Sequence, residues 1–526
     1  MNHIKHLTIE GFKKFVSFQM DFNEHMNILV GENEAGKSTI LDALRTVLNQ
    51  QYRNADKAIL RDLFNVDMVK EFQKHPGIRT LPRIKIEVQL ELDPNRKDAD
   101  YFYGEVYGAR TKQPEKYGIR FECSFDEELG DGLNEIINDG KIPYEYYSLT
   151  WTTFANRPYQ MVKRPINFIS IDTTNNGAAS SFNYYNRSLF ASKYDESTRT
   201  KAKNTFRDKL DQAFELTGLP PIDEKRKFGI DGKKVVLETV LSVYEDSIPL
   251  ENRGSGMESL IKTKIALDRG SGLNVIMMEE PENHLSFTTL RKMLQEISNQ
   301  QKTSQIIVAT HSNMIASRLN LNNVLWITDQ GAKSLSNVDR DVADFFVKAD
   351  DNAFLQLLLS KKAILVEGAT EFLLVPSFYQ RLTGKSIEED EVTVISCNGI
   401  SYKKYLKIAE STNKKIAVIT DNDGNQERIG EADAFNKAHD LQHVFMAGDI
   451  RDWTWEVCIY NKNTALLDKL IETQPGAQYR FHDNDYGAVL GKMLNNKVDI
   501  AFLMLTSSKE YEVPQYVKDA ITWINR

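Results

Sequence analysis

Residues 31–39 carry the feature that most constrains the fold of this chain, the segment Gly-Glu-Asn-Glu-Ala-Gly-Lys-Ser-Thr. This segment matches the phosphate-loop pattern G-x-x-x-x-G-K-[ST]. The apolar run at 27–30 suits a buried strand, and residues 39–44 suit a helix. In that context the loop turns backbone N–H groups toward phosphate oxygens, and the helix start adds positive potential. The sequence therefore predicts a strand–loop–helix unit that binds ATP, with a chance glycine turn as the alternative.

The side chains of this loop have distinct expected roles. Lys37 is expected to neutralise charge on the outer phosphates, and Ser38 to bind magnesium. Gly36 lets the backbone approach the nucleotide, and Asn33 and Thr39 are expected to line the same ATP site.

Composition excludes several classes of protein. A length of 526 residues predicts two or three domains. No apolar run is long enough to span a bilayer and no signal peptide is evident, so we expect a cytoplasmic protein without a membrane partner. Cys123, Cys397 and Cys458 form no C-x-x-C pair, which argues against structural zinc and disulfides. A net charge of −8 means that any DNA contact comes from local basic patches or through metal ions.

The hydrophobic pattern divides the chain into regions. Residues 3–30 alternate as two paired strands would, and 83–92 alternate more strictly, as a half-buried antiparallel strand with Gln89 on its polar side. Residues 190–217 have helical spacing with many charges. From 361 to 430, apolar strands and helical segments alternate, which predicts a parallel sheet.

Two later strands complete the expected ATP site. An apolar run at 275–278 ends at Glu279 and Glu280. Glu279 is expected to hold the water shell of the magnesium ion, and Glu280 to orient or deprotonate the attacking water. The strand at 306–310 ends at His311, which is expected to touch the terminal phosphate or its water.

A second glycine-rich segment, Arg-Gly-Ser-Gly-Met-Glu at 253–258, precedes an expected helix. Ser255 and Gly256 would form a second anion-binding helix start. Two such elements in one chain are what an ATP molecule shared between two subunits requires.

Together these residues resemble the ABC-type ATPases of the SMC-like group. That resemblance is supported by the opening segment 9–15, with Lys13 or Lys14 expected near the phosphates. One departure is Glu279, where most such ATPases carry aspartate; the longer side chain is expected to alter magnesium geometry.

Acidic residues follow two of the later apolar runs. Glu367 and Glu371 follow one run, and Asp421 and Asp423 follow another. The carboxyl ends of parallel strands meet at one sheet edge, and a period of two turns the two aspartates the same way. Oxygen ligands suit Mg²⁺ or Mn²⁺. The alternative is a Rossmann-like domain whose acids cap helices.

This order of acids resembles a Toprim domain. Glu456 is a candidate further metal ligand, and Lys497 a candidate for stabilising the charge of a transition state. Alone, each would be a commonplace exposed residue.

The chain as a whole resembles the OLD (overcoming lysogenisation defect) family of ATP-dependent endonucleases. The resemblance implies an α/β fold, with an ABC-type (SMC-like) ATPase domain and helical insert followed by a Toprim Rossmann-like parallel-sheet domain. The expected boundaries are 1–174 and 233–345 for the two parts of the ATPase, 175–232 for the helical dimerisation insert and 346–526 for the Toprim nuclease.

The resemblance also implies a function. The protein would be an ATP-binding and ATP-hydrolysing endonuclease that uses divalent metal to nick or cleave DNA, assembled as a homodimer or higher oligomer. Glu367, Glu371, Asp421, Asp423 and Glu456 would bind the metals, and Lys497 would be the catalytic lysine. Many relatives act in bacterial anti-phage defence, some with a partner protein or RNA, and the sequence leaves that role open.

Two other functions stay open. The first is an ATP-switched DNA-binding clamp or scaffold without cleavage. The second is a topoisomerase or primase, which the lack of a separate tyrosine domain and of zinc-type cysteine pairs disfavours. Neither the DNA target nor the sign of control by ATP follows from the sequence.

Overall fold

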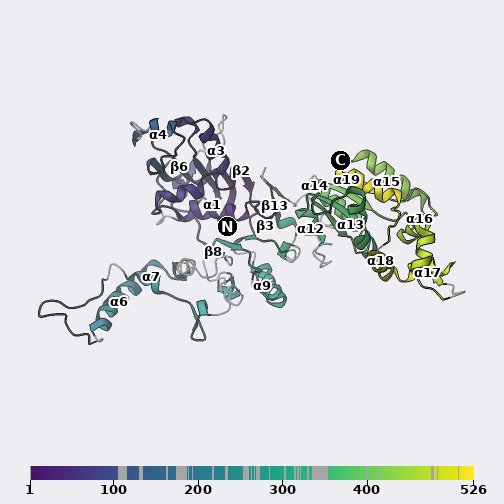
Figure 1. The fold of residues 1–526 in the computed structure, drawn as a ribbon. Helices are drawn as coiled ribbons and strands as arrows, with labels where there is room; N and C mark the ends of the chain where they lie inside the picture. The colour runs from purple at the N-terminus through teal and green to yellow at the C-terminus, as the bar shows by residue number, and fades with distance from the viewer. Residues whose placement is uncertain are drawn as a thin grey trace. The chain divides into compact units, whose positions relative to one another are not determined.

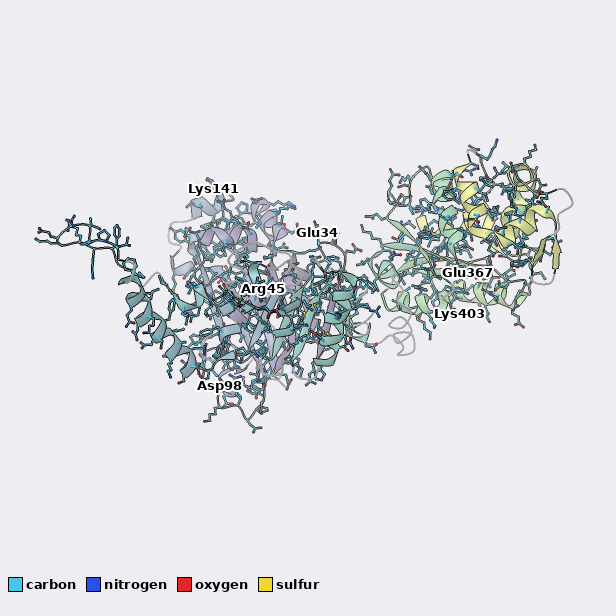
Figure 2. All side chains as sticks on the ribbon, turned by 90° about the horizontal axis from the view of Figure 1, so that it is seen from below. Glu34, Arg45, Asp98, Lys141, Glu367 and Lys403 are labelled. Atoms are coloured by element: carbon cyan, nitrogen blue, oxygen red, sulfur yellow. The ribbon has the colours of Figure 1, made fainter. Side chains whose placement is uncertain are left out.

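The chain forms two compact units, residues 1–336 and 337–526, in a computed structural model (Figure 1). Arg45 belongs to the first unit and Glu367 to the second (Figure 2). The structure describes all residues except 1, 105–114, 130–133, 161–163, 173–185, 188, 192, 216–217, 232–234, 253–259, 262, 266, 268–272, 284, 301–303, 313–314, 317–318, 320, 329–330, 335–352, 399–400, 413, 475–478, 482–483 and 508. Within the described part, no helix is long and apolar enough to cross a membrane.

The first unit contains an antiparallel sheet of order β2-β1-β4-β6-β5, with β7 also paired to β6. Its strands are β1 (His3–Phe12), β2 (Phe15–Asp21), β4 (Ile84–Glu91), β5 (Tyr103–Gly104), β6 (Lys116–Phe125) and β7 (Tyr147–Thr153).

A second sheet of this unit has the order β14-β13-β3-β12-β11-β8. All of its pairs are parallel except that of β13 with β14. The carboxyl ends of β3, β12 and β11 therefore lie side by side at one edge. The strands are β3 (Met26–Val30), β8 (Phe168–Asp172), β11 (Val275–Glu279), β12 (Gln305–Ala309), β13 (Val324–Thr328) and β14 (Gly331–Ser334).

Two expectations about these strands are wrong. The strands within 3–30 that pair are β1 and β2, whereas β3 lies in the other sheet, because it is buried on both faces as a central parallel strand is. Nor does β4 expose a polar face, since Gln89 and Glu87 are buried. Arg120 from the neighbouring strand donates to Glu87 at 2.7 Å, which lets a charged residue lie inside.

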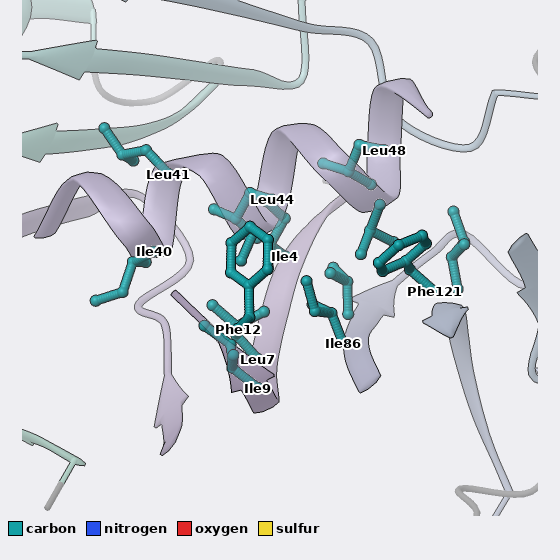
Figure 3. Close-up of a cluster of buried hydrophobic side chains, with 14 of the residues drawn as sticks. Ile4, Leu7, Ile9, Phe12, Ile40, Leu41, Leu44, Leu48, Ile86 and Phe121 are labelled. Atoms are coloured by element: carbon teal, nitrogen blue, oxygen red, sulfur yellow. The ribbon is translucent and has the colours of Figure 1, made fainter. Parts of the chain in front are cut away.

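Helix α1 (Lys37–Asn49) is held by the main core of the unit (Figure 3). Its apolar side chains, among them Ile40 and Leu44, join Ile86 of the antiparallel sheet and Met277 of the parallel sheet in one buried cluster. The Nε1 of Trp151 donates to a carbonyl of the helix at 2.9 Å. The helix that begins at the phosphate loop is thereby fixed against both sheets.

Among the described residues of the first unit, further helices are α2 (Leu60–Leu63), α3 (Val66–Lys74), α4 (Asn134–Asn138), α6 (Glu196–Glu215), α7 (Leu237–Val240) and α9 (Phe287–Gln300). Helix α6 confirms a helix within 190–217. The boundaries of the insert at 175–232 stay a prediction, since part of it lies outside the described residues.

In the second unit, β15 (Lys362–Val366), β16 (Val392–Ser396), β17 (Lys415–Ile419) and β18 (Gln442–Phe445) form a parallel sheet of order β16-β15-β17-β18. The helices α13 (Ala369–Thr383), α14 (Tyr402–Thr412) and α15 (Gln426–Ala438) connect these strands in turn. The predicted alternation over 361–430 is confirmed.

The chain leaves β15 and β17 in opposite directions, because α13 leads to β16 on one side and α15 leads to β18 on the other. The carboxyl ends of β15 and β17 thus border a topological switch point, where open α/β sheets bind ligands. The further elements are α12 (Ala353–Leu359), α16 (Trp455–Leu470), a hairpin of β19 (Tyr479–Phe481) and β20 (Asn484–Tyr486), α17 (Ala488–Asn495), α18 (Lys497–Thr506) and α19 (Gln515–Asn525).

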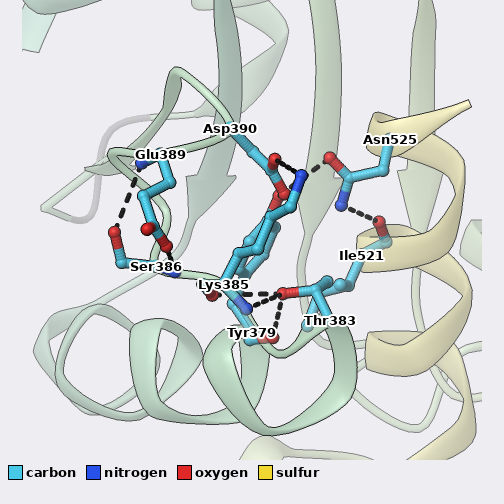
Figure 4. A network of polar contacts seen from close by, with 8 residues as sticks. All are labelled: Tyr379, Thr383, Lys385, Ser386, Glu389, Asp390, Ile521 and Asn525. Atoms are coloured by element: carbon cyan, nitrogen blue, oxygen red, sulfur yellow. Dashed lines mark hydrogen bonds and ion pairs between the residues drawn. The ribbon is translucent and has the colours of Figure 1, made fainter.

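Polar contacts fasten α19 to α13 (Figure 4). The hydroxyl of Tyr379 lies 2.8 Å from Oδ2 of Asp390 and 2.7 Å from Oδ1 of Asn525. Lys385 donates to the other oxygen of Asp390 at 3.0 Å. Burial raises the pKa of Tyr379 to about 12, so the phenol stays protonated and can donate.

We predict that Gly11→Ala strongly destabilises the first unit. Gly11 has a φ of +68°, and a Cβ there would lie 2.0 Å from the carbonyl oxygen of Arg83. The left-handed backbone and the clash with a backbone atom together should exceed about 2 kcal/mol.

The control is Gly77→Ala, where φ is extended and the nearest atom to a Cβ is 3.8 Å away. Calorimetry of the full chain should show a lower unfolding temperature for the first variant and little change for the second. Equal shifts of the unfolding temperature in the two variants would contradict the conclusion that position 11 requires glycine.

Candidate functional site

The phosphate loop joins β3 to α1 as predicted, and Gly36 makes the turn. This residue has a φ of +100°, and a Cβ on it would lie 2.3 Å from the ring of Phe15. Lys37 is buried, and its Nζ donates to the carbonyls of Gly31 at 3.0 Å and Glu32 at 3.1 Å. The loop therefore folds around its own lysine.

The other residues expected at this loop lie on the same turn. Ser38 and Asn33 are exposed, whereas Thr39 is buried. Ser38 is available to a ligand, as a residue that binds the magnesium of a nucleotide must be.

Three carboxylates lie near the lysine of the loop. Burial lowers the pKa of Lys37 to about 8, and Glu280, Glu282 and Glu279 act in the opposite direction. Glu279 is the last residue of β11 and the other two follow it directly, and β11 is separated from β3 only by β12. Parallel pairing therefore brings these acids to the phosphate loop, among them Glu279 and Glu280, which the sequence predicted at the ATP site.

Glu279 is buried and paired. Its Oε2 lies 3.4 Å from Nη2 of Arg45, and the same guanidinium donates to Oγ of Ser170 at 3.1 Å. Arg45 also pairs with Asp42, which forms a second ion pair with Lys13. Lys13, expected near the phosphates, is thus connected through Asp42 and Arg45 to the acidic strand end.

Glu280 and His311 face each other. The Oε1 of Glu280 lies 3.8 Å from Nε2 of His311, and Oε2 accepts from Asn283 at 2.7 Å. The backbone of Glu280 has a φ of +45°, a strained conformation that directs this residue out of the strand. Burial, with Lys37 nearby, lowers the pKa of His311, which favours the neutral imidazole.

Glu282 is a functional candidate whose role the sequence alone did not predict. Its Oε1 accepts from Oγ1 of Thr310 at 2.6 Å and from the backbone N of His311 at 3.0 Å. Among the described residues, its Oε2 is buried with no hydrogen-bond partner, and burial raises its pKa. Glu282 thus holds the segment that carries His311. The sequence signal that could have identified it is its place as the third acid of the segment Glu-Glu-Pro-Glu at 279–282.

The predicted second anion-binding segment, with Ser255 and Gly256, lies outside the described residues. Its roles stay predictions.

In the second unit, Glu367 follows β15 and Asp421 follows the next strand of the sheet, β17. The Oε2 of Glu367 accepts from Oγ1 of Thr420 at 3.0 Å and from the N of Asp421 at 3.4 Å. Glu371, in the first turn of α13, is buried and accepts from the N of Gly368 at 3.1 Å. These three acids meet at the switch point of the sheet.

Glu456 and Lys497, the weakest sequence candidates, join the same cluster. The hydroxyl of Thr454 lies 2.7 Å from Oδ2 of Asp421 and 3.0 Å from Oε2 of Glu456. Lys497 donates to the same oxygen of Glu456 at 2.9 Å. Thr454 was missed at the sequence level, because a threonine before a helix is an ordinary cap residue.

The acids act on one another electrostatically. Burial, followed by Glu371, Glu367 and Glu456, raises the pKa of Asp421 to about 7, against the hydrogen bond from Thr454. Burial raises the pKa of Glu371 as well, with contributions from Glu456 and Glu367. The cluster is therefore a concentration of negative charge that a cation would stabilise.

Asp423 is not placed as its spacing suggested. Strand β17 ends at Ile419, so a period of two no longer applies; Asp423 has a φ of +52° and pairs with Arg428. The buried Asn422 fixes this turn by donating to the carbonyl of Ala447 at 2.9 Å.

The donor set of this cluster fits a hard divalent cation. Its side-chain ligands are all oxygen, which suits Mg²⁺ or Mn²⁺. In the part of the chain that the structure describes, however, no three acidic, histidine or cysteine side chains already converge on one metal position. Lys497 and Arg428 instead neutralise Glu456 and Asp423, so bound metal would have to compete with these two cations.

Comparison with known proteins agrees with the division of the chain into two units. A profile of the AAA ATPase domain matches residues 3–213 and 169–316. A profile described as the overcoming lysogenization defect protein-like Toprim domain matches residues 358–423, the segment that holds Glu367, Glu371, Asp421 and Asp423.

Two curated relatives are similar over a short segment. The DNA replication and repair proteins RecF of Lactobacillus johnsonii and Lactobacillus gasseri are each 27% identical over 99 residues, 18% of this chain. The chain spans about a quarter of the length of these relatives.

Solved SMC heads are distantly similar. An SMC head bound to the C-winged helix domain of ScpA matches with 14% identity and a TM-score of 0.34, over 64% of this chain and 100% of that one. The SMC head domain from Thermotoga maritima matches with 14% identity and a TM-score of 0.30, over 63% and 99%.

The AAA ATPase profile extends over more than half of the chain, and the Toprim profile falls on the acidic sheet edge of the second unit. The predicted α/β pairing of an ATPase domain with a parallel-sheet Toprim domain is confirmed. The chain belongs to the AAA ATPase domain family and joins this domain to an OLD-like Toprim domain, the architecture of OLD-family ATP-dependent nucleases.

Proposed function

We propose that this protein is a DNA endonuclease that depends on divalent metal and is regulated by the binding and hydrolysis of ATP. The observation that carries the proposal is the convergence of Asp421, Glu456 and Lys497 through Thr454, beside Glu367 and Glu371. These residues come from distant segments, and their mutual repulsion is a cost to folding that a catalytic role explains.

In the first unit, Lys37 binds and neutralises the outer phosphates of ATP. Ser38 and Glu279 would hold the accompanying Mg²⁺. Glu280 orients the attacking water and accepts its proton, with His311 across from it at 3.8 Å. Glu282 keeps His311 in position through Thr310 and the backbone N.

In the second unit, Glu367, Glu371, Asp421, Asp423 and Glu456 would hold Mg²⁺ or Mn²⁺, which when bound supplies charge stabilisation and an activated water. The ammonium of Lys497 lies at the same cluster and stabilises negative charge that develops on the phosphate during cleavage. Thr454 positions the carboxylates of Asp421 and Glu456.

Assembly and partners belong to the same proposal. DNA is the proposed substrate, and the RecF relatives are named for replication and repair of DNA. Ser255 and Gly256 would contact ATP bound by a second copy, so the active form would be a homodimer or higher oligomer joined through residues 175–232. A cytoplasmic role in anti-phage defence, with a partner protein or RNA, extends the proposal.

The first test concerns ATP. Glu280→Gln should bind ATP normally and lose at least about 100-fold in hydrolysis, because the amide cannot accept the proton of the water. Lys37→Ala should lose stable binding, since the cation at the phosphates is gone. Binding and phosphate release are measured in parallel. Turnover by Glu280→Gln at the wild-type rate would contradict its role.

The second test concerns DNA. Asp421→Asn should reduce plasmid cleavage with Mg²⁺ or Mn²⁺ at least about 100-fold while ATP binding persists. The matched control is Asp440→Asn, an exposed aspartate that precedes β18 and therefore lies at the amino ends of the strands, away from the acidic cluster. Cleavage that persists in Asp421→Asn would refute the proposed site. A wild-type protein that binds plasmid and leaves it intact would favour the ATP-switched clamp.

The third test uses pH and metal. The folded pKa of Asp421 is about 7 against an ordinary value of 3.8, so its contribution to stability is complete below about pH 4 and is lost as pH rises through 7. In EDTA the melting temperature of the second unit should therefore decline over this range. Mg²⁺ should reduce the decline, and so should Asp421→Asn. An unchanged pH profile in Asp421→Asn would contradict the assigned shift.

A further inference from the structure

A pocket of about 250 Å³ opens beside the acidic cluster, and apart from Glu367 the residues named here from its lining have no role in the chemistry described above. It lies between the carboxyl ends of β15 and β17 and the first turns of α14 and α15. Val366, Val418 and Ile419 form its apolar wall, and Glu367, Tyr402 and Arg428 add polar groups. Glu367 belongs to both the pocket and the acidic cluster, so a group bound in the pocket lies next to the proposed site of cleavage.

The two larger polar side chains of the pocket begin neighbouring helices. Tyr402 is the first residue of α14, and Arg428 lies in the first turn of α15. The Arg428 side chain is 30% exposed and its guanidinium pairs with Asp423. An aromatic ring, a guanidinium and an apolar wall within one small pocket match the parts of a nucleotide, which are a flat base and a phosphate.

The size of the pocket restricts the ligand. Pockets for drug-sized molecules are commonly about 300–1,000 Å³, so a pocket of about 250 Å³ holds no more than a single nucleotide and excludes a base pair. A base can enter only if it is unpaired or turned out of the duplex.

We propose that this pocket binds one unpaired nucleotide of the DNA strand beside the phosphate that is cleaved, with the base against Tyr402 and the adjoining phosphate on Arg428. This inference rests on the proposed nuclease function and specifies its substrate as single-stranded or locally unpaired DNA.

The ion pair of Asp423 with Arg428 would then have a function in the binding of DNA and metal. Arg428 exchanges the carboxylate of Asp423 for a phosphate when DNA binds. Asp423 then loses its neutralising partner and becomes available as a metal ligand. Substrate binding and metal binding at this edge would therefore support each other.

Binding in EDTA tests the proposal without cleavage. The probe is a single-stranded oligonucleotide that carries the fluorescent base 2-aminopurine, titrated with the full chain at several salt concentrations. Arg428→Ala should weaken binding about 5- to 10-fold and reduce the slope of log affinity against log salt by about 0.7, the value for one phosphate contact on a single strand. The control is Arg381→Ala. Arg381 lies in the last turn of α13 and does not line the pocket, so this variant should bind the oligonucleotide as the wild type does.

Removal of Arg428 also exposes the charge of Asp423, which by itself would repel DNA. The same substitution is therefore made in an Asp423→Asn background. If Arg428 contacts a phosphate, Arg428→Ala still weakens binding there; if it only neutralises Asp423, the effect disappears and the proposal is overturned.

The ring of Tyr402 is tested through 2-aminopurine fluorescence, which stacking quenches. Tyr402→Phe should retain the quenching, and Tyr402→Ala should lose it, with melting temperatures recorded to verify folding. Phe372→Ala, an aromatic residue 45% exposed on α13, is the control and should retain quenching. Quenching that survives Tyr402→Ala would overturn the placement of the base.

A mononucleotide, 2-aminopurine deoxyribonucleoside monophosphate, tests whether the pocket binds a nucleotide within a DNA strand or a free nucleotide. The oligonucleotide should bind much more tightly. Equal affinity, with competition at equal concentrations, would identify a site for free nucleotides and overturn the DNA assignment. A wild-type protein that shows the predicted Arg428 and Tyr402 effects and cuts no DNA refutes the nuclease function while leaving the pocket assignment intact.

Discussion

Parallel pairing of apolar strands is the constraint on which both candidate sites depend. Strands such as β3 and β15 are too apolar to tolerate an exposed face, so each is covered by helices or by the neighbouring sheet. Parallel connections return each strand in the same direction, which brings successive carboxyl ends to one edge. The polar residues that terminate these strands therefore meet, although hundreds of residues separate Lys37 from His311 in the sequence.

The cost of this arrangement is electrostatic, and both units limit it in a similar way. Each gathers several carboxylates where burial raises the energy of their charged forms. In the first unit Arg45 and Lys37 lie among the acids, and in the second Lys497 and Arg428 do. These cations stabilise the isolated protein, and they are also the groups that anionic substrates would attract. The same side chains can thus serve stability before binding and recognition during it.

Backbone strain completes both sites. Gly36, Glu280 and Asp423 all have positive φ, at the phosphate loop, the acidic strand end and the turn after β17. For the two acids this conformation is uncommon, and buried contacts hold it, such as that of Asn422 with the carbonyl of Ala447. In Glu280 and Asp423 this strain directs the side chain away from the line of the preceding strand, which regular alternation would not do.

Local pattern was sufficient for much of this protein. The motif at 31–39, the acids at 279 and 280, and the alternation over 361–430 each predict an element that the structure contains, because glycine spacing and apolar runs act over a few residues. The chemistry assigned to these elements stays a prediction. Placement across distant segments required the tertiary structure. Only packing shows that β3 lies in a different sheet from β1, that Lys497 reaches Glu456, and that Asp423 turns to Arg428. Strand partners, side-chain pairs and turns depend on residues far away in the chain, and no local periodicity records them.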